Sequence, residues 1–354
     1  MKPIRYALLA LSLACASAHA TTVRIHYDAG TQALAVRGDK GPMTWSQGVP
    51  AERGVDGVWS YTWPDALGDV QMKPALGDKV STGGVYRIKA GGTLDIYPFF
   101  GAPFGKVTIV EGIESPQLKN KRALRVYLPP SYQENTRKHY PVLYMHDGQN
   151  LFDAKTASFG TEWGIDETVN RLIATGQMAE VIVVGIDNTP ERIAEYTPCC
   201  DPKHGGGRLD AYRKFIVETV KPYVDRSYRT LPGREHTAIM GSSLGGIASV
   251  YIAQKDPGVF SKAGGVSSSF WWNQGALTKT VPRVPVKFYI DAGTRDDGLP
   301  DTERMRDAML STGYRPDVDL YFHAADGGSH NEKSWAARVD KPLVWFFPWN
   351  TTTP

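Results

Sequence analysis

The sequence predicts an α/β protein in which a small all-β sandwich precedes a larger domain built on a parallel sheet. Short runs rich in β-branched and aromatic residues, separated by Gly, Pro and Asp, fill residues 21 to about 104 without a helical period. Beyond about Lys106, apolar strand-like runs alternate with helical patterns, which is typical of parallel strands joined by crossover helices. The composition, 42% hydrophobic and 22% charged over 354 residues, is ordinary for globular proteins and excludes disordered and fibrous classes.

The first twenty residues have the pattern of an export signal. Lys2 and Arg5 give a basic start, Ala7 to Ala16 form an apolar run, and Ala18-His19-Ala20 places small residues where a signal peptidase cleaves. An apolar run of this length is too short to span a bilayer, so we expect removal rather than anchoring. The mature chain is therefore expected to begin at about Thr21 and to be exported, to the periplasm or beyond the cell.

The charge balance gives no electrostatic case for binding nucleic acid or an anionic membrane. The formal charge is +3 at pH 7, and two of the positive charges belong to the predicted export signal. No later stretch approaches the eighteen apolar residues that a membrane-spanning helix needs. We expect neither nucleic acid nor membrane as a partner.

Two cysteines remain after the export signal, and they are adjacent in the sequence. Cys199 and Cys200 leave two interpretations open: a vicinal disulfide, or two free thiols in a loop. His204 is the only histidine close by, and the spacing differs from the C-x-x-C pattern of zinc sites. We expect no metal site there.

The larger domain is expected to span residues 105 to 354, after a linker near Gly101–Gly105, where Gly and Pro separate the two patterns. The run at 181–186 is apolar throughout, as expected for a strand covered on both faces. The predicted strands cover 142–145, 181–186, 237–240, 286–290 and 318–322, and the predicted helices about 164–176, 209–224, 244–255 and 301–312.

The sharpest chemical signal is Gly241-Ser242-Ser243-Leu244-Gly245, directly after a predicted strand and before a helical pattern. Glycines on either side of a serine permit the tight, strained turn that lifts its hydroxyl above the sheet in a nucleophile elbow. This context predicts Ser243 as a nucleophile. Ser242 is in the wrong register, because the second glycine then falls three residues on instead of two.

A serine nucleophile needs a base, and only two histidines follow Ser243. His323 lies inside an alternating strand, which indicates a structural position. His330 follows that strand in a glycine-rich turn at its carboxyl end, where the active groups of parallel sheets gather. We therefore favour His330 as the base.

The acid that orients the imidazole should follow an earlier strand, and the segment after it offers three carboxylates. Asp291 comes straight off the strand and suits a turn. Asp296 and Asp297 lie further out, where either could reach Nδ1 of the imidazole. The residues alone do not separate these two.

Acyl transfer also needs two N–H groups aimed at the developing oxyanion. One comes from Leu244, the residue after the nucleophile. The other is expected from the loop around Gly148–Gln149, which follows a predicted strand.

These residues resemble the putative-esterase group of α/β-hydrolases over about residues 106–350. The resemblance implies an α/β-hydrolase fold and esterase activity without a cofactor or metal. It also implies that the acid is Asp296, the fourth residue of Gly293-Thr294-Arg295-Asp296, and that the backbone N–H of Gln149 is the second oxyanion donor. The motifs that carry it are RVYLPPSY, YPVLYMHDGQNLF, VIVVGIDN, EYTP, GSSLGG, SSSFWW and GGSH.

The first domain, residues 21–104, resembles more loosely the starch-binding or early-set sandwiches that precede some glycan-active enzymes. Trp45, Trp59 and Trp63 could stack on sugar rings there, although tryptophan in a sandwich is more often buried. Glycan contact through this domain is therefore one expectation, and core packing is the other.

Three further residues are candidates for substrate binding. Trp271 and Trp272 follow a strand close to the elbow and could wall an aromatic or sugar pocket, or else pack in the core. Arg192 could pair with a substrate carboxylate or catecholate, or else form a structural ion pair with Glu195.

The function expected is a secreted serine carboxylic-ester hydrolase. Its expected substrates are feruloyl or acetyl esters of polysaccharide, or siderophore trilactones. Two alternatives stay open: an acyltransferase with the same triad, because both use an acyl-enzyme, and a glycan-binding protein on a non-catalytic hydrolase scaffold.

Overall fold

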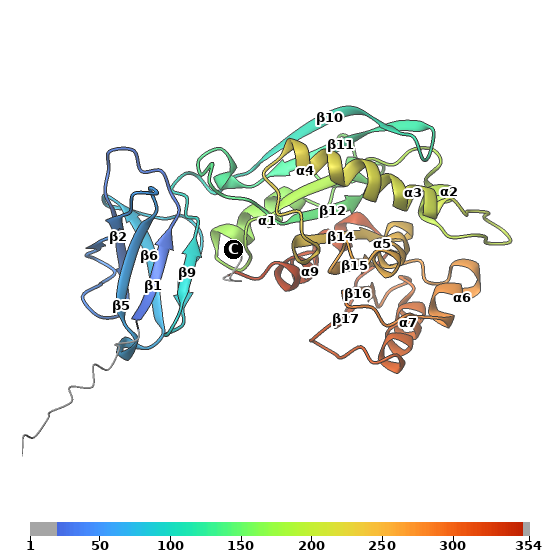
Figure 1. Ribbon diagram of the computed structural model, residues 1–354. Coiled ribbons are helices and arrows are strands. Elements are labelled where there is room, and N and C mark those ends of the chain that lie inside the picture. Colours follow the sequence, from blue (N-terminus) through green and yellow to red (C-terminus); the bar gives the residue numbers. More distant parts are fainter. Residues whose placement is uncertain (1–19, 350–354) are drawn as a thin grey trace, which may run out of the picture.

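The computed structural model describes residues 20–349, so the predicted export signal lies outside the described residues except for Ala20. Figure 1 shows a small β domain at one end and a larger α/β domain beside it. This is the architecture that the sequence predicts, and the prediction of the fold class is confirmed.

The first domain consists of two facing sheets. Alternate residues of β1 and β2 are buried, as expected of strands with one face on a core, and Val23, Ile25 and Val36 belong to that core. One sheet has the order β4 (Glu52–Arg53), β5 (Trp59–Pro64), β1 (Ala20–Ile25), β9 (Thr93–Ile96). The other contains β3 (Val49–Pro50), β2 (Leu34–Gly38), β6 (Val70–Leu76), β7 (Lys79–Val80) and β8 (Tyr86–Ile88), and a single turn of 3₁₀ helix, η1 (Asp65–Leu67), follows β5.

The three tryptophans predicted to meet sugars in this domain differ in exposure. Trp59 and Trp63 are 6% and 2% exposed and pack in the core, so neither can stack on a sugar ring. Trp45 is 44% exposed. Of the three, only Trp45 is displayed.

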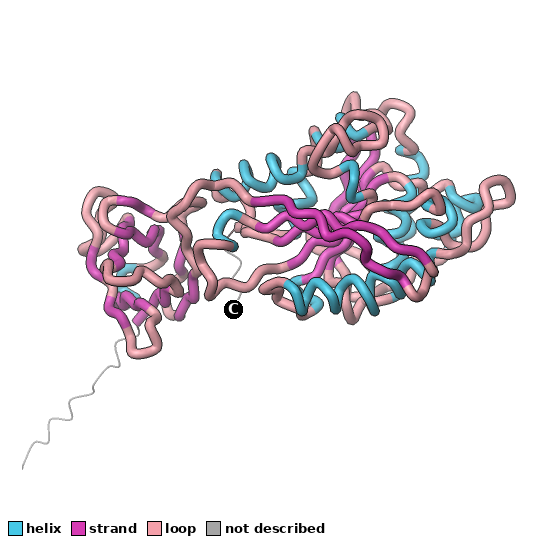
Figure 2. Tube along the Cα trace, turned by 90° about the horizontal axis from the view of Figure 1, so that it is seen from above, coloured by secondary structure: helices cyan, strands magenta, loops and turns pink. Residues whose placement is uncertain are grey.

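Residues just after β9 make contacts with both domains. Phe99 packs into the core of the larger domain, whereas its neighbour Phe100 packs into the core of the sandwich. Glu134, from the larger domain, accepts hydrogen bonds from the Phe100 N–H at 2.6 Å and the Tyr27 hydroxyl at 2.9 Å. Figure 2 shows the connecting chain between the two domains.

An eight-stranded sheet runs through the larger domain. Within it the six strands from β13 to β17 are parallel, and β10 and β11 add an antiparallel hairpin at one edge. The sequence did not predict this hairpin, because half of the residues of β10 are exposed and polar residues interrupt its apolar ones. The order is β10 (Lys106–Ser115), β11 (Asn120–Leu128), β13 (Ile182–Ile186), β12 (Val142–His146), β14 (Thr237–Ser242), β15 (Lys262–Val266), β16 (Lys287–Gly293), β17 (Leu320–Ala325).

Helices cover both faces of this sheet, which explains its continuous apolar strands. Along β12, Val142 and Tyr144 join one core cluster, while Leu143 and Met145 join the cluster on the opposite face. The helices are α1 (Ile165–Ala174), α2 (Arg192–Tyr196), α3 (Leu209–Phe215), α4 (Lys221–Ser227), α5 (Leu244–Lys255), α6 (Trp272–Lys279), α7 (Leu299–Ser311), α8 (Glu332–Ala336) and α9 (Asp340–Phe346), with a π-helical turn, η4 (Ile216–Val220), and short 3₁₀ turns η2 (Pro130–Tyr132), η3 (Gly148–Asn150) and η5 (Arg234–His236).

Local sequence explains where individual helices form. In α1, Ile165, Val169, Leu172 and Ile173 are buried at the spacing of one helical face, and Glu167 in the first turn complements the helix dipole. Among residues 20–349, no helix combines the length and apolar character needed to cross a bilayer.

Candidate active site

The turn between β14 and α5 places Ser243 in a strained backbone conformation. Its φ and ψ are 56° and −121°, a region that a residue with a side chain rarely occupies outside functional sites. The flanking glycines make this turn feasible, because a Cβ on Gly241 would lie 2.8 Å from the His146 ring and 2.9 Å from the backbone of Gly245. The geometry is that of a nucleophile elbow.

His330 lies within hydrogen-bond distance of this serine. Its Nε2 is 3.0 Å from Oγ of Ser243, and Oγ of Ser269 lies 3.3 Å from the same hydroxyl. His330 follows β17 in the turn at the carboxyl end of the sheet, while His323 lies inside β17 and pairs in register with Asp291 of β16. The structure therefore brings His330 to Ser243 and leaves His323 in the sheet.

The acid beside the imidazole is Asp297, and the prediction of Asp296 is wrong by one residue. Oδ1 of Asp297 lies 2.7 Å from Nδ1 of His330, and Asp297 is only 3% exposed. Asp296 has a φ of 48° and an exposed side chain, so the turn directs the two neighbouring carboxylates to opposite sides. Burial raises the pKa of Asp297, but hydrogen bonds from His330, Ser267 and the Gly293 N–H outweigh it and hold this pKa below its usual value.

The backbone N–H groups of Leu244 and Gln149, the predicted oxyanion donors, have no hydrogen-bond acceptor among residues 20–349. Leu244 opens α5, and Gln149 lies in η3. Gly148 allows this loop to lie against the sheet, because a Cβ there would fall 2.7 Å from the backbone of Gly185 and 2.6 Å from Oδ1 of Asp187. Unpaired N–H groups at a helix start and in a tight turn suit an oxyanion.

Arg192 braces this same loop. It donates to both carboxylate oxygens of Asp147, at 2.7 and 2.8 Å, and Asp147 has the left-handed φ of 56° with which the loop begins. The ion pair weighed for Arg192 with Glu195 does not form, because Glu195 is buried against Arg122 at 3.0 Å. Arg192 also lines the cleft, but the carboxylate that it binds is that of Asp147 and not one of a substrate.

A cleft of about 850 Å³ opens over Ser243 and His330. Asn188 and Asn331 add amide groups to its wall, and Phe159, 81% exposed, lies at its margin. A second cavity, of about 280 Å³, lies between the two domains and contains none of these residues. The larger cleft is the one that meets the Ser243 hydroxyl.

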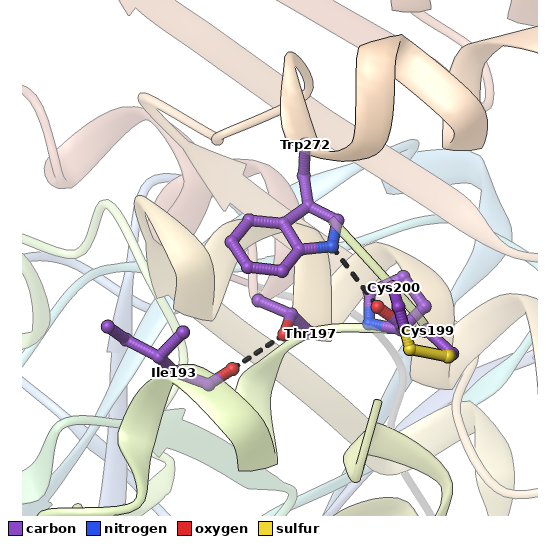
Figure 3. Close-up of a disulfide and its surroundings, with 6 residues drawn as sticks. Ile193, Thr197, Cys199, Cys200 and Trp272 are labelled. Carbon is purple, nitrogen blue, oxygen red and sulfur yellow. Dashed lines mark hydrogen bonds between the residues drawn. A yellow bond between two sulfur atoms is a disulfide. The ribbon is translucent and has the colours of Figure 1, made fainter. Parts of the chain in front are cut away.

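Of the two tryptophans predicted to bind substrate, one is buried. Trp272 is 3% exposed and donates its indole N–H to the carbonyl of Pro198 at 3.1 Å, so the prediction of a substrate contact for it is wrong (Figure 3). Trp271 is 42% exposed, but neither tryptophan lines the cleft. In the same loop Cys199 and Cys200 are joined by a disulfide, which decides between the two interpretations of this pair.

One group of carboxylates could hold a cation. The side chains of Glu162, Asp166 and Glu167 bring their oxygens within 4.8 Å of one another. Burial, with Glu167 close by, raises the pKa of Asp166 to about 7. None of the three lines the cleft over Ser243.

Sequence reasoning missed two residues that shape the site. Ser267 donates to Asp297 at 2.5 Å, and its position directly after β15, at the carboxyl end of the sheet, was the available signal. Arg338 binds the same carboxylate at 3.1 Å, but it lies beyond every motif and no pattern in the sequence indicated it.

A family model described as "Putative esterase" matches residues 115–345. Among curated proteins, the uncharacterized protein YbbA of Bacillus subtilis is 23% identical over 263 residues, which cover 69% of this chain and all of that protein.

Solved structures with the same fold include two esterases. The enterobactin esterase FES from Shigella flexneri superposes with a TM-score of 0.55 at 16% identity, over 89% of this chain and 88% of that one. The CE1 ferulic acid esterase AmCE1/Fae1A from the anaerobic fungus Anaeromyces mucronatus gives a TM-score of 0.52 at 21% identity, over 70% and 91% of the two chains.

Proposed function

The chain belongs to the esterase family whose model matches residues 115–345, and we propose that it is a serine carboxylic-ester hydrolase whose nucleophile is Ser243. One observation carries the proposal: hydrogen bonds run without a break from Ser243 through His330 to Asp297, at 3.0 and 2.7 Å. This order of serine, imidazole and carboxylate is the arrangement that activates a hydroxyl for acyl transfer.

The reaction follows from these contacts. Oγ of Ser243 attacks the ester carbonyl and passes its proton to Nε2 of His330, while the carboxylate of Asp297 stabilises the imidazolium. The N–H groups of Gln149 and Leu244 donate to the oxyanion of the tetrahedral intermediate. His330 then returns the proton to the departing alcohol, and a water molecule activated by His330 hydrolyses the acyl-enzyme. Every step uses a group of this chain, so the proposal calls for no cofactor.

We propose esters whose acyl group carries an aromatic ring as the substrate class, either feruloyl esters on polysaccharide or a catecholate siderophore trilactone. Acetyl esters of polysaccharide are the alternative outside this class. The names of the two structural neighbours support this choice. A cleft of about 850 Å³ with an aromatic side chain, Phe159, at its margin is large enough for such a group. Export, expected from the first twenty residues, would place the enzyme where these polymers and siderophores occur.

A panel of esters tests this proposal. Purified protein is given a chromogenic aryl acetate, methyl ferulate, feruloylated and acetylated xylan, and a catecholate trilactone, with Ser243→Ala as the control. We expect turnover of the aryl acetate and a preference of at least about tenfold in kcat/KM for one of the other esters.

Three results would change the account. No turnover of any ester by folded protein would contradict the hydrolase and favour the non-catalytic scaffold. Transfer of the acyl group to an added sugar in preference to water would identify an acyltransferase. Equal rates on all esters would remove the proposed substrate class and leave the esterase.

A further inference from the structure

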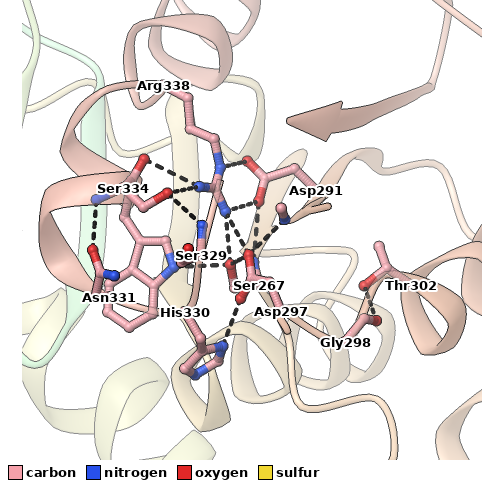
Figure 4. A network of polar contacts seen from close by, with 12 residues as sticks. Ser267, Asp291, Asp297, Gly298, Thr302, Ser329, His330, Asn331, Ser334 and Arg338 are labelled. Carbon is pink, nitrogen blue, oxygen red and sulfur yellow. Dashed lines mark hydrogen bonds and ion pairs between the residues drawn. The ribbon is translucent and has the colours of Figure 1, made fainter. Parts of the chain in front are cut away.

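The carboxylate of Asp297 faces His330 with one oxygen, and a buried set of donors holds the other (Figure 4). Oδ2 of Asp297 accepts hydrogen bonds from Oγ of Ser267 and from the Gly293 N–H, both at 2.5 Å, and from Nη2 of Arg338 at 3.1 Å. A carboxylate held by three donors on one oxygen cannot rotate without breaking them, so its second oxygen has a fixed direction.

Arg338 binds a second buried carboxylate at the same time. It donates to Asp291 through Nε at 3.0 Å and through Nη2 at 3.1 Å, and Asp291 is fully buried. Arg338 is itself only 4% exposed. One guanidinium therefore compensates two carboxylates, and its loss would leave buried negative charge without a cation.

The same arginine is tied to the segment that carries His330. Its Nη1 donates to the carbonyl of Ser334 at 3.1 Å and to the Ser334 hydroxyl at 3.0 Å. That hydroxyl accepts from the N–H of Ser329, the residue before His330, at 2.9 Å. Arg338 thus joins the loop of the acid to the loop of the base.

We propose that Arg338, together with Ser267, is a positioning residue: it fixes the carboxylate of Asp297, which the turn brings to the base, so that Oδ1 faces His330. The inference rests on the proposed ester hydrolysis at Ser243. Arg338 acts through Asp297, because it is buried behind this carboxylate and does not line the cleft.

The charges around the imidazole predict a signature that a purely structural role would lack. The titratable and charged groups on the buried side are the carboxylates of Asp297 and Asp291, the Arg338 guanidinium, His323 opposite Asp291 on β17, and the Tyr289 hydroxyl, which donates to Asp291 at 2.7 Å. On the cleft side they are Glu332, Lys333, Asp147 and Arg192. Without Arg338, Asp291 and the Asp297 carboxylate that contacts the imidazole would lose the cation they share. The protonated imidazole would be favoured, and the acidic limb of the pH–rate profile would move to higher pH.

The test compares Arg338→Met with wild type on a chromogenic aryl ester. We expect kcat to fall about 10- to 100-fold with KM within about threefold, and the acidic limb to move up by about half a pH unit or more. Arg338→Lys keeps the positive charge but lacks the several N–H donors of a guanidinium. It should therefore return the acidic limb of the pH–rate profile to its wild-type position and restore only part of kcat. Arg304→Met, on the exposed face of α7, is the matched control and should behave as wild type.

A second variant covers the case in which Arg338→Met does not fold. Ser267→Ala removes one hydrogen-bond donor to Asp297 but no charge. We therefore expect kcat to fall about tenfold while the acidic limb of the pH–rate profile stays at its wild-type position. Wild-type kcat and pH profile in folded Arg338→Met, or in folded Ser267→Ala if the first variant does not fold, would overturn the positioning role. Absence of ester turnover by wild-type protein would instead refute the proposed function, so the two failures are distinguishable.

Discussion

Nδ1 of His330 lies 2.7 Å from Oδ1 of Asp297, while the neighbouring Asp296 faces solvent. The two carboxylates differ by one position in a tight turn, and that step reverses the direction of the side chain. Because the left-handed backbone of Asp296 produces the reversal, the backbone of this turn determines which carboxylate meets the base.

Asparagine substitutions should separate the two carboxylates. Asp297→Asn keeps the shape but favours the wrong imidazole tautomer, so we expect kcat on an aryl ester to fall by about 10⁴. Asp296→Asn is the matched control and should stay near wild type, because its side chain is exposed. If circular dichroism shows both variants to be folded, a large loss of kcat in Asp296→Asn with near wild-type kcat in Asp297→Asn would refute Asp297 as the acid.

Gly148→Ala should damage the oxyanion site. The added Cβ would lie 2.7 Å from the backbone of Gly185, so the loop must shift and carry the Gln149 N–H with it. Loss of one such donor costs about 10²- to 10³-fold in kcat. Gly258→Ala is the control, because a Cβ there meets nothing within 4 Å. Wild-type kcat in Gly148→Ala would argue against this loop as an oxyanion donor.

Removal of the sandwich should spare catalysis and lower stability. Every residue that lines the catalytic cleft comes from Asp147 onward, so a chain that begins at Tyr97 should hydrolyse an aryl ester within about threefold of the wild-type rate. Its Tm should fall, because Glu134 and Asn135 lose partners in the first domain. Keeping Phe99 matters, since it packs in the core of the larger domain. A folded truncated chain without activity would show that the sandwich contributes to the site.

His146 should make stability depend on pH. Burial lowers its pKa to about 4, so between about pH 6.5 and pH 4 the unfolded chain binds a proton that the folded chain does not. The free energy of unfolding should therefore fall as the pH drops through this window, by about 3 kcal/mol from this group. Urea unfolding of wild type and of His146→Gln at pH 7, 5.5 and 4.5 measures it. Equal pH slopes in the two proteins would contradict the prediction.

Much of the fold was predictable because burial follows a period. The strand at 142–145 alternates between two apolar faces, and the glycines around Ser243 mark the elbow. His330 was predictable from its place after a strand. The orientation of Trp272 was not predictable, because a tryptophan can be either buried or exposed to solvent. The packing of α6 on the loop of Pro198 decides between the two.

Contacts between distant segments account for the rest. Asp147 pairs with Arg192 of α2, 45 residues away in the sequence, and Arg338 pairs with Asp297, 41 residues away. Neither pairing leaves a local pattern, since an arginine on a loop or a short helix has the same sequence signature whether it meets a substrate or a buried carboxylate. The acid was misassigned for a related reason: the direction of Asp296 depends on a backbone angle.

One rate measurement tests most directly whether Ser243 is the nucleophile. Ser243→Ala and its neighbour Ser242→Ala are compared with wild type on a chromogenic aryl ester. We predict that folded Ser243→Ala loses at least about 10⁴-fold in kcat, because the acyl-enzyme can no longer form, whereas Ser242→Ala keeps measurable turnover. Wild-type turnover by folded Ser243→Ala, free of wild-type protein, would contradict the account.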